Sequence, residues 1–145
     1  EDDEGNLNFY RIDNINRSKL YGLSSQKSFY LKNLAILVVK NEINFDYLNK
    51  KNSDEVTNLL IKIKGIGHWT INNYKIFALQ DTNAWPSADL ALQEAVKLLK
   101  GLEIRPNEKE MEKIGSMWKP HRAAAALFLW HFYNKVKVEK ASYTL

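Results

Sequence analysis

Hydrophobic residues recur at steps of three and four along most of the chain. The segment 24–41 has such residues at Tyr30, Leu34, Leu37 and Val38. This spacing is expected of a helix that packs by one face. Ser24 stands directly before the pattern, where its hydroxyl can cap the first helical turn. The segment therefore predicts a helix with a defined start.

The same period continues in five further segments. They begin near Asp54, Trp69, Asp89, Asn107 and Pro120. Asn52 and Asn107 each stand three residues before a glutamate, the spacing of a capping box, and Pro120 suits the first turn of a helix that ends near Lys135. No segment alternates with period two, so the chain predicts an all-α fold of about six helices. We expect one helical domain over 20–145, preceded by an acidic and polar segment at 1–19.

The composition narrows the classes of function. Lysine and arginine outnumber aspartate and glutamate by 21 to 17, which permits an acidic partner such as nucleic acid without requiring one. The absence of cysteine excludes disulfides, thiolate zinc sites and cysteine-bound iron–sulfur clusters. The three histidines are far apart in sequence, so we expect no side-chain metal site and no cofactor. No apolar run approaches the roughly 18 residues of a membrane span, and we expect an intracellular protein, in a bacterial cytoplasm or a eukaryotic nucleus.

The stretch "KGIGHWT", residues 64–70, places two glycines around one isoleucine between two predicted helices. Gly65 allows the chain to leave the first helix through a left-handed turn, and Gly67 allows it to reverse without a side chain in the way. One interpretation is an ordinary helical hairpin. The other is that the bare loop exposes backbone N–H groups at the start of the next helix, where a phosphate binds favourably.

Four pieces of sequence, in order, resemble one family. They are "LYGLSSQKSFYLKNLA", "LLIKIKGIGHWTINNYKIFAL", "NAWPSADLALQEAV" and "MWKPHRAAAALFLW". Together they resemble the helix-hairpin-helix DNA glycosylases, and among these the AlkA-type enzymes that remove alkylated bases. The match runs from about Leu20 to Tyr133. Each piece alone is weak, but four in the right order and at plausible spacing are specific.

The resemblance implies a DNA partner that contains alkylated bases, bound by a monomer. The backbone of the hairpin would hold a DNA phosphate, with a monovalent cation on backbone 63–68 in some relatives. The residues implied in backbone binding are Lys64, Gly65, Ile66, Gly67, His68 and Thr70.

The family's catalytic carboxylate falls on Asp89. An aspartate three residues after Pro86 and directly before "LALQEAV" is also a good helix N-cap. The two roles are compatible, because the positive end of a helix favours an ionised carboxylate. In the catalytic role, the carboxylate would stabilise the oxocarbenium-like sugar that forms as the base departs.

The resemblance also places aromatic residues around the extruded base, where Trp69 and Trp130 match pocket positions. Trp85 and Tyr74 are weaker candidates for the same pocket. Core packing is the competing interpretation for each of them. Bifunctional relatives carry a lysine nucleophile where this chain has Trp69, so the resemblance implies a monofunctional enzyme that leaves an abasic site.

The chain departs from the family at its start, because only about twenty residues precede "GLSSQK". We therefore expect part of the N-terminal lobe to be missing, including the residue that fills the gap left by the extruded base. The alternative function is a non-catalytic helix-hairpin-helix module that only holds DNA. That alternative accounts for the glycines and the basic balance, but not for Asp89.

Overall fold

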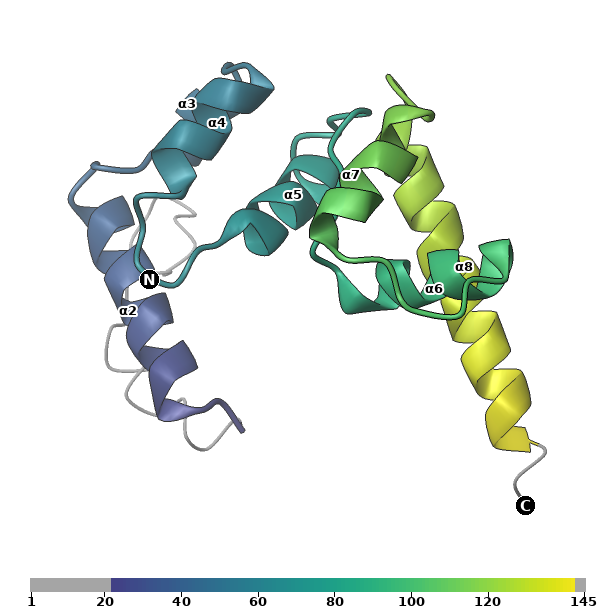
Figure 1. The fold of residues 1–145 in the computed structure, drawn as a ribbon. Helices are drawn as coiled ribbons and strands as arrows, with labels where there is room; N and C mark the ends of the chain where they lie inside the picture. The colour runs from purple at the N-terminus through teal and green to yellow at the C-terminus, as the bar shows by residue number, and fades with distance from the viewer. Residues whose placement is uncertain (1–21, 143–145) are drawn as a thin grey trace. The chain divides into compact units, whose positions relative to one another are not determined.

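The computed structural model describes the backbone of residues 22–142 and the side chains of residues 22–138. These residues form helices joined by loops and turns, with no strand between residues 22 and 142 (Figure 1). The helices are α2 (Ser25–Val39), α3 (Phe45–Leu48), α4 (Ser53–Leu60), α5 (His68–Phe77), α6 (Leu90–Lys100), α7 (Glu108–Ser116) and α8 (Arg122–Ser142). The predicted all-α fold is confirmed. The four-residue α3 is the helix that the sequence pattern did not predict, and the predicted segment 1–19 lies outside the described residues.

The chain divides into two compact units, one ending at Ile66 and the other beginning at Gly67. The division falls inside the glycine-containing stretch, within the range 20–145 for which the sequence predicted a single domain.

The first unit contains α2, α3 and α4. Ser24 caps α2 by accepting a hydrogen bond from the N–H of Lys27, as predicted. Asn52 and Glu55 form the predicted capping box at the start of α4. Between residues 22 and 66, the unit buries four apolar residues: Leu48, Val56, Leu60 and Ile63.

The second unit contains α5 to α8 and a larger core. α6 packs against α8, and the two helices cross in the view of Figure 1. The buried apolar cluster includes Ile76, Trp85, Leu92, Val96, Met111 and Leu129. Leu92, Ala95 and Val96 on α6 are buried, whereas Leu99, which continues the same apolar spacing, is 50% exposed. Asn107 and Glu110 form the second predicted capping box, at the start of α7.

The last helix differs from its predicted bounds at both ends. It begins at Arg122 and continues to Ser142, whereas the sequence predicted a start at Pro120 and an end near Lys135. Residues 118–121 form a turn in which the N–H of His121 donates to the carbonyl of Trp118 at 2.7 Å. Pro120 therefore precedes the helix. Beyond Lys135 the sequence has neither glycine nor proline, so nothing local ends the helix there.

Among the helices between residues 22 and 142, none is long and apolar enough to cross a bilayer.

Candidate active site

Asp89 is the N-cap of α6, as the sequence predicted. Its Oδ1 accepts a hydrogen bond from the N–H of Leu92 at 2.9 Å, and the side chain is largely buried, at 7% exposure. The preceding turn is closed by a bond from the N–H of Asp89 to the carbonyl of Pro86. The carboxylate is therefore held at the positive end of α6, which favours a negative charge.

Gln93 fixes the loop that carries Asp89. It is buried on the first turns of α6, and its Nε2 donates to the carbonyl of Ser87 at 2.9 Å. Its own N–H donates to the carbonyl of Asp89. Sequence reasoning missed this residue, because a glutamine inside an amphipathic helix gives no signal of which backbone group it will reach.

Two indole N–H groups converge on the carboxylate of Asp89. Trp69 on α5 donates from Nε1 to Oδ2 at 2.6 Å. Trp130 on α8 donates from Nε1 to Oδ1 at 3.2 Å. Together with the backbone N–H of Leu92, three donors therefore surround the two oxygens, an arrangement that complements an anion. The fold brings together residues that are 20 and 41 positions from Asp89 in sequence.

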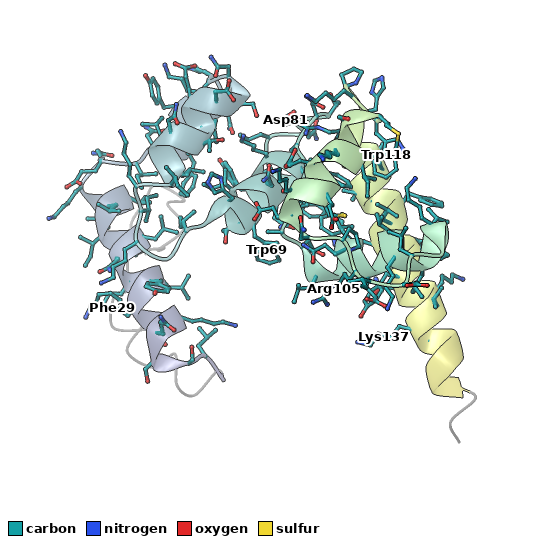
Figure 2. The ribbon with its side chains drawn as sticks, viewed as in Figure 1. Phe29, Trp69, Asp81, Arg105, Trp118 and Lys137 are labelled. Atoms are coloured by element: carbon teal, nitrogen blue, oxygen red, sulfur yellow. The ribbon has the colours of Figure 1, made fainter. Side chains whose placement is uncertain are left out.

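The indoles also present aromatic surface to solvent. Trp69, labelled on α5 in Figure 2, is 50% exposed although its N–H is bound to Asp89. Trp130 is partly buried against the core and stacks on Phe77, with ring centroids 5.8 Å apart and an interplanar angle of 22°. Trp130 therefore packs partly on the core, and its N–H reaches the carboxylate. Its place in a base pocket stays a prediction.

Phe77 is a second residue that sequence reasoning missed. It ends α5 and is 63% exposed while it stacks on Trp130. The available signal was its position eight residues after Trp69, a spacing that recurs along one side of a helix. An exposed phenylalanine next to an indole extends the aromatic surface beside Asp89.

Trp85 does not belong to this surface. It is only 2% exposed, and its Nε1 donates to the carbonyl of Met111 at 3.1 Å. Its ring packs edge-on against Trp118 with centroids 5.5 Å apart. An indole enclosed in this way offers no face to an incoming base, so Trp85 is a core residue rather than the predicted pocket residue.

Tyr74 is partly buried on α5, and burial raises the pKa of its phenol. The phenol is therefore neutral near pH 7 and is able to donate or accept a hydrogen bond. Its predicted place in a base pocket stays a prediction.

In the first unit, the glycine turn is built around Gly65. Its φ of +94° lies in the left-handed region, and a Cβ at this position would overlap the ring of Tyr30 on α2. The predicted need for glycine is thus confirmed twice, by backbone conformation and by space. Lys64 is exposed, and the N–H of Ile66 donates to the carbonyl of Ile63 at 3.0 Å. A carbonyl oxygen has two lone pairs, so the carbonyl oxygen of Ile63 can coordinate a cation in addition to this hydrogen bond.

In the second unit, Gly67 is the N-cap of α5 and forms no side-chain cap. The N-caps of α2, α3, α4, α6 and α7 all accept such a bond through their side chains. The first N–H groups of α5 therefore lack an intrahelical partner and a side-chain cap. His68 and Thr70, in the first turn, are exposed, and a Cβ at Gly67 would meet no atom within 4 Å.

Comparison with known proteins identifies relatives that are named DNA-3-methyladenine glycosylases. A DNA-3-methyladenine glycosylase of Bacillus subtilis is 32% identical over 108 residues, which are 74% of this chain and 36% of that protein. DNA-3-methyladenine glycosylase 1 of Schizosaccharomyces pombe is 30% identical over 110 residues, covering 75% of this chain and 48% of that protein. The chain is homologous to the DNA-3-methyladenine glycosylases. It spans less than half the length of these two curated relatives. No protein-family model matches it.

The fold agrees with this homology. The solved S. pombe 3-methyladenine DNA glycosylase, in complex with abasic DNA, matches with a TM-score of 0.79 at 27% identity. The match covers 84% of this chain and 61% of that chain. A solved DNA-3-methyladenine glycosidase of Bacillus halodurans matches with a TM-score of 0.69, also at 27% identity, over 83% of this chain and 56% of that chain. The helix-hairpin-helix glycosylase fold predicted from the sequence is thereby confirmed.

Proposed function

We propose that this chain acts in base-excision repair as a monofunctional DNA glycosylase that hydrolyses the N-glycosidic bond of alkylated purines such as 3-methyladenine and 7-methylguanine. One observation carries the proposal. In a homologue of DNA-3-methyladenine glycosylases, the buried carboxylate of Asp89 is held by the indole N–H groups of Trp69 and Trp130 beside exposed aromatic surface.

Asp89 is the catalytic residue of the proposed reaction. As the damaged base departs, positive charge develops on the deoxyribose, and a fixed carboxylate beneath the ring stabilises it. Two unit charges 4 Å apart attract by about 4 kcal/mol at an effective dielectric constant of 20, which corresponds to about a thousandfold in rate. Since three N–H donors already orient the carboxylate, little reorganisation is needed when the charge appears. The same carboxylate can position the attacking water.

The aromatic surface supplies the base pocket. Extruding a nucleotide from duplex DNA costs a few kcal/mol, and a damaged base costs less than a sound one. A base that carries a positive charge then gains about 0.5 to 2 kcal/mol over an aromatic face. The exposed rings of Trp69 and Phe77 offer such surface beside Asp89, with Phe77 stacked on Trp130. A base that is already cationic also leaves readily, which suits a site with one carboxylate.

The proposed enzyme leaves an abasic site and does not cut the strand. In the family resemblance, Trp69 stands where bifunctional relatives carry their lysine nucleophile. An indole has no amine to form a Schiff base with the sugar. The solved S. pombe relative is bound to abasic DNA, which is the product expected of the proposed reaction.

The segment 64–70 is the proposed contact with the DNA backbone. Exposed Lys64 offers a cation to a phosphate, and the uncapped start of α5 offers backbone N–H groups. The open space at Gly67 allows a phosphate to approach the main chain closely. Such contacts hold double-stranded DNA and do not read its sequence.

The test measures methylated purines released from dimethyl-sulfate-treated DNA by the wild type and by Asp89→Asn. Asparagine caps a helix as well as aspartate does, so the variant keeps the cap on Leu92 while losing the negative charge. We expect the variant to lose release and to bind duplex DNA as well as the wild type or slightly better. Strand breaks should appear only after mild alkali.

A matched control separates catalysis from capping. Asn107→Ala removes an N-cap on α7 in the same unit, at a cost of about 1 kcal/mol, without touching Asp89. It should retain release. Duplex binding without release by the wild type would contradict the proposal and favour the non-catalytic DNA-binding module.

A further inference from the structure

Two consecutive aromatic residues of α2 contact two consecutive residues of the glycine turn. The ring of Tyr30 occupies the space where a side chain at position 65 would lie. The ring of Phe29, labelled in Figure 2, has the ammonium of Lys64 at 5.4 Å from its centroid. The two rings are 6.1 Å apart and tilted by 56°. All four residues belong to the first unit.

The ring of Tyr30 is itself held in place. Gln26, one turn earlier on α2, donates from Nε2 to the Tyr30 hydroxyl at 2.9 Å. Tyr30 is partly buried, whereas Phe29 is about half exposed. The contact with Gly65 is made by ring carbons, so the phenyl ring rather than the hydroxyl supports the turn.

Gly65 needs such support because glycine at positive φ has no side chain to restrict its backbone. A ring packed directly on the Cα removes alternative conformations of the turn. The direction of the neighbouring peptide groups is then fixed before any ligand binds, which reduces the entropy cost of binding. Phe29 restricts the Lys64 ammonium in the same way through a cation–π contact.

We propose that Tyr30 and Phe29 are positioning residues for DNA-backbone binding, acting through Gly65 and Lys64. This inference rests on the proposed role of segment 64–70 in holding DNA. We expect this platform, formed by the rings of Tyr30 and Phe29, to act on DNA binding, because its contacts are with Gly65 and Lys64.

The experiment compares Tyr30→Ala, Tyr30→Leu and Tyr30→Phe on undamaged duplex DNA and on a methylated duplex, with concentrations corrected for the folded fraction. Tyr30→Phe keeps the ring and loses only the bond from Gln26, so it should bind as the wild type does. Tyr30→Ala and Tyr30→Leu should raise the Kd about five- to tenfold on both duplexes, the size expected when a preorganised loop becomes mobile. The single-turnover rate of base release at saturating protein should stay within about twofold of the wild type.

Phe29→Leu tests the other half of the platform. It should raise the Kd, and the effect should disappear in the Lys64→Ala background, because the ring acts through that ammonium. Lys64→Ala alone should make the plot of log Kd against log salt concentration less steep, by the amount expected when about one phosphate contact is lost.

The outcomes separate this inference from the proposed function. Base release is measured independently of affinity. A wild type that binds duplex DNA without releasing bases would contradict the proposed glycosylase activity, while the role of Tyr30 and Phe29 in DNA binding would still be tested by the Kd values. If folded Tyr30→Leu binds DNA as tightly as Tyr30→Phe, the platform is overturned. A loss of saturated rate with unchanged Kd would also overturn it. Should Tyr30→Ala fail to fold, Tyr30→Leu decides, since it retains apolar bulk beside Gly65.

Discussion

The indole N–H of Trp69 donates to Oδ2 of Asp89 at 2.6 Å, while the same indole remains half exposed. One side chain therefore orients the carboxylate and presents an aromatic face beside it. Oδ1 of the same carboxylate has two other donors, Leu92 and Trp130, so the two oxygens depend on Trp69 to different degrees.

This asymmetry predicts different effects for two conservative substitutions. Trp69→Phe removes the indole donor to Oδ2 and should lower the single-turnover rate of base release about ten- to a hundredfold, the size of a hydrogen bond to a charged group. Trp130→Phe removes a longer bond from an oxygen that keeps the N–H of Leu92, and should cost less. Rates at saturating protein measure both effects. Equal losses, or a larger loss for Trp130→Phe, would contradict the assigned geometry.

Phe77→Ala should weaken recognition of the damaged base. The substitution removes the exposed ring that is proposed to contact the extruded base, and one aromatic contact contributes about 0.5 to 1.5 kcal/mol, so the concentration for half-saturation of methylated duplex should rise about two- to tenfold. Undamaged duplex should bind as before. The matched control is Phe128→Ala, because Phe128 is similarly exposed at 59% but lies two residues before Trp130, roughly 200° around α8. An equal effect of both substitutions would argue against a role for Phe77 in the pocket.

Two glycine substitutions should separate stability from DNA binding. A Cβ at Gly115 would lie 2.6 Å from Nε1 of Trp85, so Gly115→Ala should destabilise the protein by about 1 to 3 kcal/mol. Gly67 has an ordinary φ of −110° and open space, so Gly67→Ala should leave the melting temperature nearly unchanged. It should instead raise the Kd for duplex DNA, since the added methyl group stands where a phosphate is proposed to approach. Thermal melts and binding isotherms on both variants check this, and a destabilised Gly67→Ala with normal binding would reverse the assignment.

The capping box of α4 should weaken in acid. The hydrogen bond from the N–H of Asn52, followed by the bond from Lys51, lowers the pKa of Glu55. A lowered folded-state pKa means that the stabilisation is present above the ordinary pKa of a glutamate, about 4.3, and is lost as the pH falls through the lower folded value. Urea unfolding of wild type and Glu55→Gln should therefore differ most near pH 7 and converge toward pH 3. A difference that persists at pH 3 would assign the effect to packing rather than to the charge.

Local features were predictable because they depend on neighbours in sequence. Ser24, Asn52, Asp89 and Asn107 all cap helices as expected, since a cap needs only the following turn. The glycine at position 65 was also predictable, because a sharp exit from a helix demands a left-handed residue whatever the rest of the chain does.

The role of each aromatic residue was not predictable in the same way. The sequence around Trp69 and around Trp85 gives no sign of a partner for either indole, yet the fold bonds one to Asp89 and the other to the carbonyl of Met111. An indole N–H finds its acceptor only after helices distant in the chain have packed. For the same reason Phe77, Gln93 and the ring of Tyr30 on Gly65 gave no decisive signal.

The sequence by itself therefore determined the all-α class, the capped starts of α2, α4, α6 and α7, and the glycine turn, because periodicity, capping and backbone freedom are local properties. The family resemblance pointed to Asp89 as the candidate carboxylate. Only the tertiary structure decided which side chains surround Asp89 and which ring supports Gly65. Those contacts join residues 20 to 41 positions apart around the carboxylate, and α2 with the turn after α4. Packing against a shared core sets such distances, and no local pattern encodes them.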